Sequence, residues 1–215
     1  MISRYLPIII LLSIIMLYGC RSLPDVELGN CRNLDYDAFA KNFQFDIPNP
    51  LKYRYTLRWR NKTLIANGIN QKTEEGGVNI AGYTNIGITL YSARWQDGQF
   101  EILKNNTHMP DNFLIKSILN DVLLLYRQLP AESDCIRQDV SDGSLWLETD
   151  RELAGGTGYF VVLDEQPAWG AIRNGKICFK AIVTRKTRNM PARITVENFN
   201  EGYRAEIRFF NESSV

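Results

Sequence analysis

Histidine is almost absent from this sequence, since His108 is the only one among 215 residues. A single imidazole without a Gly-x-Ser-x-Gly motif gives little basis for a catalytic nucleophile. Cysteine is also scarce, with four residues and no Cys-x-x-Cys pair, which argues against a structural zinc site. We therefore predict no catalytic residue, no metal and no cofactor, and we expect that the protein is not an enzyme.

An excess of charge of either sign is lacking as well. The 25 basic and 24 acidic residues give a formal net charge of +1, and no run of Lys and Arg occurs. Proteins that bind nucleic acid carry basic patches that neutralise phosphates, so we expect no nucleic-acid partner. The 10 Tyr, 10 Phe and 4 Trp favour β-strands as the main way to bury surface.

The longest hydrophobic run, residues 6–18, is shorter than the roughly 20 residues that a helix needs to cross a bilayer. Arg4 precedes this run, and Leu17-Tyr18-Gly19-Cys20 ends it. These features are typical of a secretory signal peptide over residues 1–19, and the ending resembles the bacterial lipobox. Such signals imply that Cys20 is lipidated and becomes the N-terminus after cleavage. The alternative is an uncleaved anchor or an ordinary signal peptide.

The residues after the signal peptide indicate the membrane to which the protein is anchored and the extent of its folded domain. Retention signals of the inner membrane have Asp directly after the Cys, whereas Arg21 stands here, so the resemblance implies the periplasmic face of the outer membrane. Residues 20–33 are polar and contain Pro and Gly, which predicts a lipidated N-terminus followed by a tether. Residues 34–215 are then expected to form one domain, because a chain of this length suits a single core.

Three cysteines remain if Cys20 carries lipid, and an odd number cannot all pair. Cys31 and Cys135 both lie in polar, loop-like sequence, whereas Cys178 lies beside Phe179 in a strand-like run where buried thiols are common. An exported protein is free to form disulfides, so Cys31 with Cys135 is the favoured pair. The alternative is three free thiols.

Alternation of apolar and polar residues predicts strands through most of the chain. In residues 51–60, basic residues and Thr56 alternate with Tyr53, Tyr55, Leu57 and Trp59, so one face of this strand is aromatic and apolar. Asp97-Gly98 and Asn174-Gly175 predict two-residue hairpin turns. Further strands are expected at 62–67, 78–94 (two strands, with Ile86, Ile88 and Leu90 alternating), 145–148, 158–163, 176–185, 192–197 and 203–210.

The period becomes helical over residues 111–129, where one stripe includes Leu114, Ile118, Val122 and Leu125. Pro110 suits the start of this helix and Pro130 its end. The strands that we can place have one apolar and one polar face, which indicates an antiparallel sheet, and their number is too large for a flat one. We predict a mostly β (α+β) fold: a curved, incompletely closed antiparallel β-barrel with a central helix as lid.

The order of these elements resembles the LolA/LolB superfamily of lipoprotein-localisation factors. The likeness rests on the lipobox, on Asn106-Thr107-His108-Met109-Pro110-Asp111 before the helix, and on Pro191-Ala192-Arg193-Ile194-Thr195-Val196 and Gly202-Tyr203 near the end. Residues 120–126 are similar to a branch of bacterial lipoproteins associated with aryl-polyene and fatty-acid-like biosynthesis clusters. The resemblance covers residues 39–210 and implies a carrier of lipids or lipoproteins.

Two interpretations of the apolar surfaces remain open. In the first, a hollow barrel holds an acyl chain or lipid ligand, and the candidate wall residues are Tyr53, Tyr55, Leu57, Trp59, Leu114, Ile118, Val122 and Leu125. The protein is then a non-enzymatic carrier or chaperone, bound to the membrane through its N-terminal lipid. In the second, the same residues form a filled core, and the protein docks an envelope partner that the sequence does not identify. An enzyme acting on polar lipid is a weaker third hypothesis.

Replacement of Cys20 by Ala tests the anchor. The variant lacks the thiol that accepts the lipid, so Cys20→Ala should leave the precursor uncut and unlabelled. Gel mobility of the precursor and incorporation of a labelled fatty acid measure the two effects. Normal cleavage and labelling of the variant would show that Cys20 is not the lipidation site.

Overall fold

The computed structural model describes residues 25–32, 35–130, 135–185 and 191–210. The predicted signal peptide and Cys20 lie outside these residues. The strands of the described part are β1 (Leu28–Arg32), β2 (Leu51–Trp59), β3 (Lys62–Lys72), β4 (Val78–Tyr83), β5 (Thr89–Gln96), β6 (Gln99–Asn105), β7 (Ile136–Asp139), β8 (Leu145–Leu153), β9 (Gly156–Leu163), β10 (Gln166–Arg173), β11 (Lys176–Arg185), β12 (Pro191–Asn198) and β13 (Tyr203–Phe210).

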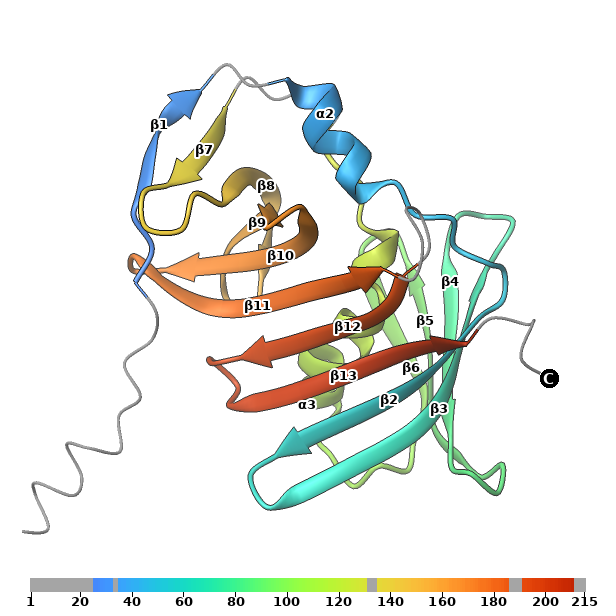
Figure 1. The fold of residues 1–215 in the computed structure, drawn as a ribbon. Helices are drawn as coiled ribbons and strands as arrows, with labels where there is room; N and C mark the ends of the chain where they lie inside the picture. Colours follow the sequence, from blue (N-terminus) through green and yellow to red (C-terminus); the bar gives the residue numbers. More distant parts are fainter. Residues whose placement is uncertain (1–24, 33–34, 131–134, 186–190, 211–215) are drawn as a thin grey trace, which may run out of the picture.

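These strands form one antiparallel sheet in the order β1-β7-β8-β9-β10-β11-β12-β13-β2-β3-β4-β5-β6. The sheet curves round on itself, and its two edge strands, β1 and β6, do not pair with each other, so the barrel stays open (Figure 1). The structure confirms the predicted mostly β fold, a curved and incompletely closed antiparallel barrel.

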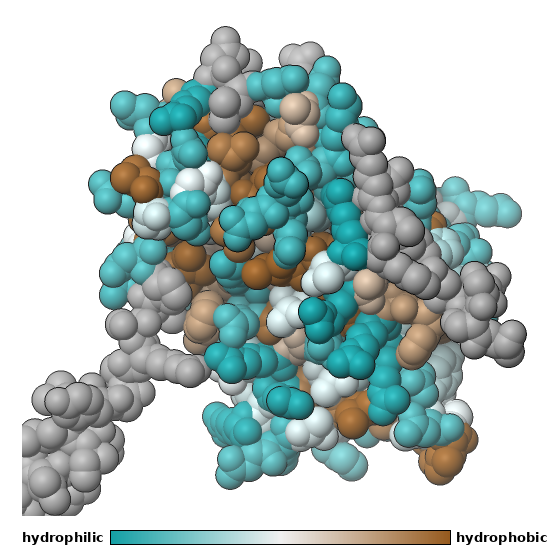
Figure 2. Space-filling view, in the orientation of Figure 1, coloured by the Kyte–Doolittle hydropathy of each residue, from teal (hydrophilic) through white to brown (hydrophobic). Residues whose placement is uncertain are grey.

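The outer face of β12, β13 and β2 is polar. Nε of Arg204 on β13 lies 3.0 Å from Oε1 of Glu197 on β12, and Nη1 of Arg193 lies 3.6 Å from Oε2 of Glu206. Figure 2 shows hydrophilic side chains over most of this face, with hydrophobic groups in separate patches. The inner face of β2 carries the buried residues Tyr53, Tyr55 and Leu57. The predicted alternation of β2 is therefore confirmed, because one of its faces packs on the core and the other meets solvent.

Two glycines make room for aromatic rings in the inner face. Tyr53, Gly68, Gly82 and Tyr91 occupy one row across β2, β3, β4 and β5. A Cβ on Gly68 would lie 2.1 Å from Cε2 of Tyr53, and one on Gly82 would lie 2.3 Å from Cε1 of Tyr91. Each ring thus lies flat over the neighbouring glycine, where a side chain would block it.

The central helix lies inside the curve, behind β12 and β13 in the view of Figure 1. It consists of α3 (Asp111–Leu114), the π-helical turn η3 (Ile115–Leu119), α4 (Asn120–Val122) and the 3₁₀ turn η4 (Leu124–Tyr126). The predicted end at Leu129 is wrong, because Arg127 already has an extended backbone with ψ of 130°. Phe113, Leu123 and Leu124 lie outside the predicted stripe and are nevertheless buried, since the sheet surrounds the helix.

A second, short helix lies between β1 and β2. The helix α2 (Tyr36–Ala40) and the 3₁₀ turn η2 (Lys41–Phe43) bring the rings of Phe39 and Phe43 to 5.4 Å. Asp35 caps the start of α2, because its side chain accepts from the backbone N–H of Ala38. No helix in the described ranges has the length and apolar character needed to span a membrane.

The strands predicted at 158–163 and 176–185 are present as β9 and β11, but these two strands and β10 are buried on both faces and not on one. Beyond the main core, Trp146, Tyr159, Val161, Ala168 and Ile177 form a second cluster, which Val26 and Leu28 cover. A strand buried on both faces does not alternate, so the sequence pattern missed β10. Val26 also donates its backbone N–H to the carbonyl of Gly175.

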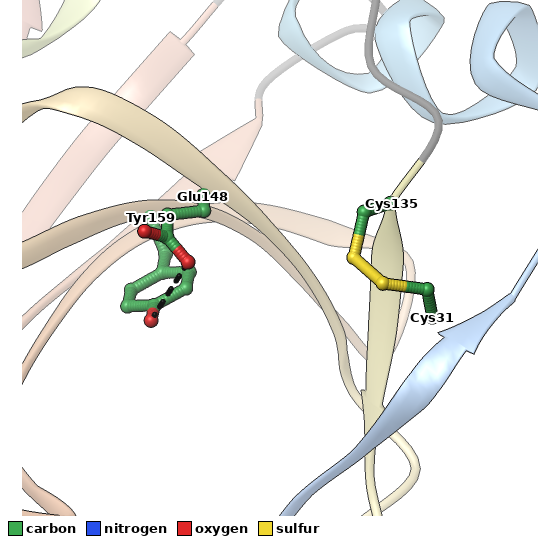
Figure 3. Close-up of a disulfide and its surroundings, with 4 residues drawn as sticks. All are labelled: Cys31, Cys135, Glu148 and Tyr159. Carbon is green, nitrogen blue, oxygen red and sulfur yellow. Dashed lines mark hydrogen bonds between the residues drawn. A yellow bond between two sulfur atoms is a disulfide. The ribbon is translucent and has the colours of Figure 1, made fainter.

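The N-terminal segment also differs from the prediction. A tether was expected through residue 33, yet residues 28–32 form β1 and pair with β7. A disulfide joins Cys31 on β1 to Cys135, directly before β7, over a sequence separation of 104 residues (Figure 3). Cys178 on β11 is a buried free thiol. The disulfide and the packing of the half-buried Leu28 on the second cluster explain why a polar segment becomes part of the sheet.

The predicted strand alternation of Ile86, Ile88 and Leu90 is wrong. Residues 84–88 form a turn, in which Thr84 accepts from Gly87 and donates to the carbonyl of Ile88. Gly87 has φ of +83°, a conformation that favours glycine and breaks the strand. Ile86 is consequently 82% exposed at the tip between β4 and β5.

Addition of a methyl group at Gly68 tests the packing of the tyrosine row. Ala ordinarily stabilises a strand relative to Gly, but here the methyl group meets the Tyr53 ring, so Gly68→Ala should lower the free energy of unfolding by about 1–3 kcal/mol. Denaturant unfolding measures this change. In a double-mutant cycle with Tyr53→Ala, the cost of Gly68→Ala should largely disappear. An unchanged cost in the Tyr53→Ala background would contradict the account.

Candidate functional site

A cavity of about 1120 Å³ lies between the two ends of the curved sheet. Its walls come from the C-terminal end of the central helix, from β4 to β6 on one side, and from β8 to β10 on the other. The apolar part of the wall consists of Ile47, Val78, Trp95, Phe100, Leu123, Leu125, Leu129, Leu153, Phe160 and Trp169. A site of this volume with aromatic and aliphatic walls is suited to an organic ligand rather than to an ion.

The segment around α2 holds one side of the cavity in place. The ring of Phe43 lies 5.1 Å from that of Phe160, and the ring of Phe45 lies 6.2 Å from that of Trp169. Tyr36 donates its hydroxyl to the carbonyl of Pro130, at the end of the wall segment that follows the helix. Figure 1 shows α2 at the end of the molecule where this segment emerges. These contacts fix the wall independently of any ligand.

A bulge in β8 forms another part of the cavity wall. The pairing register of β8 with β9 shifts between Glu148 and Glu152, and Thr149 closes the bulge by donating its hydroxyl to the carbonyl of Arg151 at 2.8 Å. Gly158 on β9 faces the bulge, where a Cβ would lie 2.6 Å from that carbonyl oxygen. Bulges turn side chains away from the regular alternation, and this one adds Thr149 and Arg151 to the cavity wall.

The charged residues on the wall are Lys72, Arg127, Glu148, Arg151 and Glu152. Burial lowers the pKa of the Arg127 guanidinium, the neighbouring Arg151 lowers it further, and Asp121 opposes both effects. Glu148 accepts a long hydrogen bond of 3.5 Å from the hydroxyl of Tyr159 (Figure 3). The wall therefore combines charged residues of both signs with apolar side chains.

One buried carboxylate fastens the helix to the sheet. Asp121 accepts from the hydroxyl of Tyr55 at 2.7 Å and from that of Tyr203 at 2.9 Å. Burial raises the pKa of Asp121 to about 7, although the two hydroxyls and Arg127 act in the opposite direction. The carboxyl group thus titrates near neutral pH in the folded protein.

A second polar contact lies beside the first. Tyr53 donates its hydroxyl to Asn70 at 3.0 Å, and the amide of Asn70 donates to the carbonyl of Val122 at 3.0 Å. That carbonyl is one of the groups that a helix end leaves without an intrahelical partner. The helix is therefore hydrogen-bonded to β2, β3 and β13 just before it reaches the cavity.

The structure separates the eight residues that the sequence suggested for a cavity wall. Leu125 lines the cavity. Tyr53, Tyr55, Leu57, Leu114, Ile118 and Val122 are buried in the layer between helix and sheet. Trp59 packs at the other end of the helix, with its ring 4.5 Å from that of Phe113. The cavity lies beyond the C-terminal end of the helix, because the middle of the helix fills the space under β2.

Sequence reasoning missed the polar residues of the site. Arg127 and Arg151 lie 24 positions apart, on a loop and in a bulge, where no periodicity marks them. Asp121 carried a signal, since an acidic residue among Leu119, Val122 and Leu123 on a buried helix needs partners. His108 is exposed in the loop before the helix. Within the described residues, no three His, Cys, Asp or Glu side chains are grouped so as to hold a metal ion.

Comparison of the sequence with protein-family models and with curated proteins finds no match. Among solved structures, the chain is similar to a LolA superfamily protein from Nitrosomonas europaea, with 9% identity over 81% of this chain and 89% of that chain and a TM-score of 0.45. A DUF1329 family protein from Desulfovibrio piger has 11% identity over 84% and 92%, with a TM-score of 0.37. The Mycobacterium tuberculosis lipoprotein LppX has 10% identity over 82% and 95%, with a TM-score of 0.33. Such low identities do not show membership of a family.

The pKa of Asp121 predicts how stability depends on pH. Its folded pKa of about 7 lies above the ordinary value of 3.8, so the stability that it contributes is complete below pH 4 and is lost as the pH rises through 7. The slope should reach at most about 1.4 kcal/mol per pH unit. Asp121→Asn does not titrate, so wild type should lose stability relative to this variant between pH 4 and pH 7.

Urea unfolding at several pH values measures the difference between the two proteins. The same replacement at Asp111, at the exposed start of the helix, serves as the control and should leave the wild-type pH profile in place. Parallel profiles for wild type and Asp121→Asn would mean that the carboxyl group is not desolvated as described.

Proposed function

We propose that this protein is a lipid-anchored, non-enzymatic carrier of acyl chains or lipids at the periplasmic face of the outer membrane. The cavity is the observation that carries the proposal. Its volume of about 1120 Å³ is slightly above the upper end of the range of small-molecule sites. Large apolar side chains from three separate parts of the fold converge on it, among polar and charged ones, and this mixture suits a ligand that joins an alkyl chain to a polar group.

The predicted anchor supports the same function. Five positions separate Cys20 from Asp25, whose carboxylate lies 3.8 Å from Nζ of Lys176 at the start of β11. Five residues span at most about 18 Å, so a lipid on Cys20 would keep the turn between β10 and β11 close to the bilayer. A carrier held at this distance could pass an acyl chain directly to the membrane.

A specific observation also favours a second candidate, a structural or interaction lipoprotein. The layer between helix and sheet has no free space for a chain, since Leu114, Ile118 and Leu119 are fully buried there. Under this hypothesis the core is filled and the cavity is only an irregular part of the surface. The two functions differ in whether any lipid enters the cavity.

Filling the cavity distinguishes the two candidates. Leu129 is half-buried on the wall, so Leu129→Trp should occupy the cavity and lower the affinity for a fluorescent fatty acid by about tenfold or more. The chain from Arg21 onward, which keeps every described residue, should bind the probe and carry lipid in native mass spectrometry. Ile65→Trp places the same side chain on the outer face of β3 and should bind like the wild type. A clean protein mass and no probe binding would support the second candidate.

A further inference from the structure

The proposed carrier function leaves the polar residues of the cavity without a role. Arg127 follows the last turn of the helix, and Arg151 belongs to the β8 bulge, yet both line the same cavity. The two guanidinium groups are close enough for the charge of one to affect the other. None of the ion pairs between described residues includes either arginine. The acidic group that acts on Arg127 is Asp121, whose two oxygens already accept from tyrosine hydroxyls, so neither arginine forms an ion pair with a described carboxylate.

Two donors at the wall are unsatisfied. The Nε of Arg127 and the Nε1 of Trp169 are buried, and neither has a hydrogen-bond partner among the described residues. Folded proteins pair nearly all buried donors, because an unpaired one costs about 1–3 kcal/mol. Lys72, by contrast, already lies over the ring of Tyr126, with Nζ 5.4 Å from its centroid. A ligand that carries a negatively charged acceptor would supply a partner for the Nε of Arg127.

We propose that Arg127 and Arg151 bind the anionic head group of the acyl ligand, while its hydrocarbon chain lies along Leu125, Leu129, Phe160 and Trp169. A guanidinium group donates two parallel hydrogen bonds to a carboxylate or a phosphate, so either head group meets the same need. The ligand class is therefore an acyl chain ending in an anionic oxygen group.

The geometry of the site favours this arrangement over binding of the chain alone. The arginines belong to two different elements, one to the segment after the helix and the other to β8, so a head group between them would contact both elements. Glu148 and Glu152 flank Arg151 on β8 and would repel an anion bound away from the two arginines. A neutral head group would form fewer and weaker hydrogen bonds with the two guanidinium groups than an anionic one.

Displacement of a fluorescent fatty acid by three unlabelled lipids of equal chain length tests the inference. The competitors are a fatty acid, a fatty alcohol and a lysophosphatidic acid, added to the chain from Arg21 onward. The wild type should bind the two anionic lipids about tenfold more tightly than the alcohol, and added salt should reduce this preference. The ratio between the fatty acid and the lysophosphatidic acid identifies the preferred head group.

The variant Arg127→Gln/Arg151→Gln should lose the preference for anionic lipids, so that the two anionic lipids and the alcohol displace the probe with similar affinity. Arg58→Gln, on the exposed outer face of β2, is the matched control and should keep the preference. Melting temperatures verify that each variant is folded. Because the salt dependence uses the wild type alone, the test does not depend on the variants.

The inference rests on the proposed carrier function, and the two fail differently. Equal affinity of the wild type for the fatty acid and the alcohol would overturn the role of the arginines and leave the carrier function intact. The same holds if the double variant keeps the preference for anionic lipids. Absence of binding of all three lipids to the wild type would overturn the carrier function together with this inference.

Discussion

Asp121 accepts hydrogen bonds from tyrosines on two neighbouring strands, and the position of the whole helix depends on this contact. Tyr55 on β2 and Tyr203 on β13 reach the carboxyl group from the sheet, and Asn70 on β3 holds the next carbonyl of the helix. These three strands are neighbours in the sheet, so the bonds fasten the helix to one region of the curved sheet. The helix end that these bonds hold forms one wall of the cavity.

Burial of this group also constrains the protein. An ionised carboxylate in an apolar layer is costly unless it is hydrogen-bonded, which is why both oxygens of Asp121 have a hydroxyl partner. The raised pKa of Asp121 shows that the two bonds do not fully compensate its burial. The helix is consequently most firmly attached when Asp121 is protonated, and its attachment weakens as the pH rises through about 7.

The sequence predicted the parts of the fold in which local chemistry decides the structure or only one face of an element packs on the core. The alternation of β2, the Asp97-Gly98 and Asn174-Gly175 turns and the start of the helix depend on local chemistry, and all four are present. The sequence did not predict β10, because both of its faces are buried. It did not predict β1 either, because the pairing of β1 depends on a strand far away in the sequence. The tyrosine–glycine row was equally hidden, since it joins four strands across the sheet.

The candidate site was less predictable than the fold. The sequence identified the apolar residues. It could not show which of them pack in the core and which line the cavity, because that depends on how closely the helix approaches the sheet. Leu125 and Ile118 belong to the same helical stripe, yet only Leu125 reaches the cavity. The two arginines came together only through the bulge in β8 and the extended backbone after the helix, neither of which leaves a periodic signal.

The central claim is that a lipid binds beyond the C-terminal end of the helix while the layer between helix and sheet stays closed. Backbone hydrogen exchange, compared with and without a bound fatty acid, tests it most directly. We predict slower exchange at residues 123–130 and 149–160, and unchanged exchange at residues 51–59 and 115–121. A change concentrated in residues 51–59 and 115–121 would show that the helix leaves the sheet to admit the lipid, and would contradict the account.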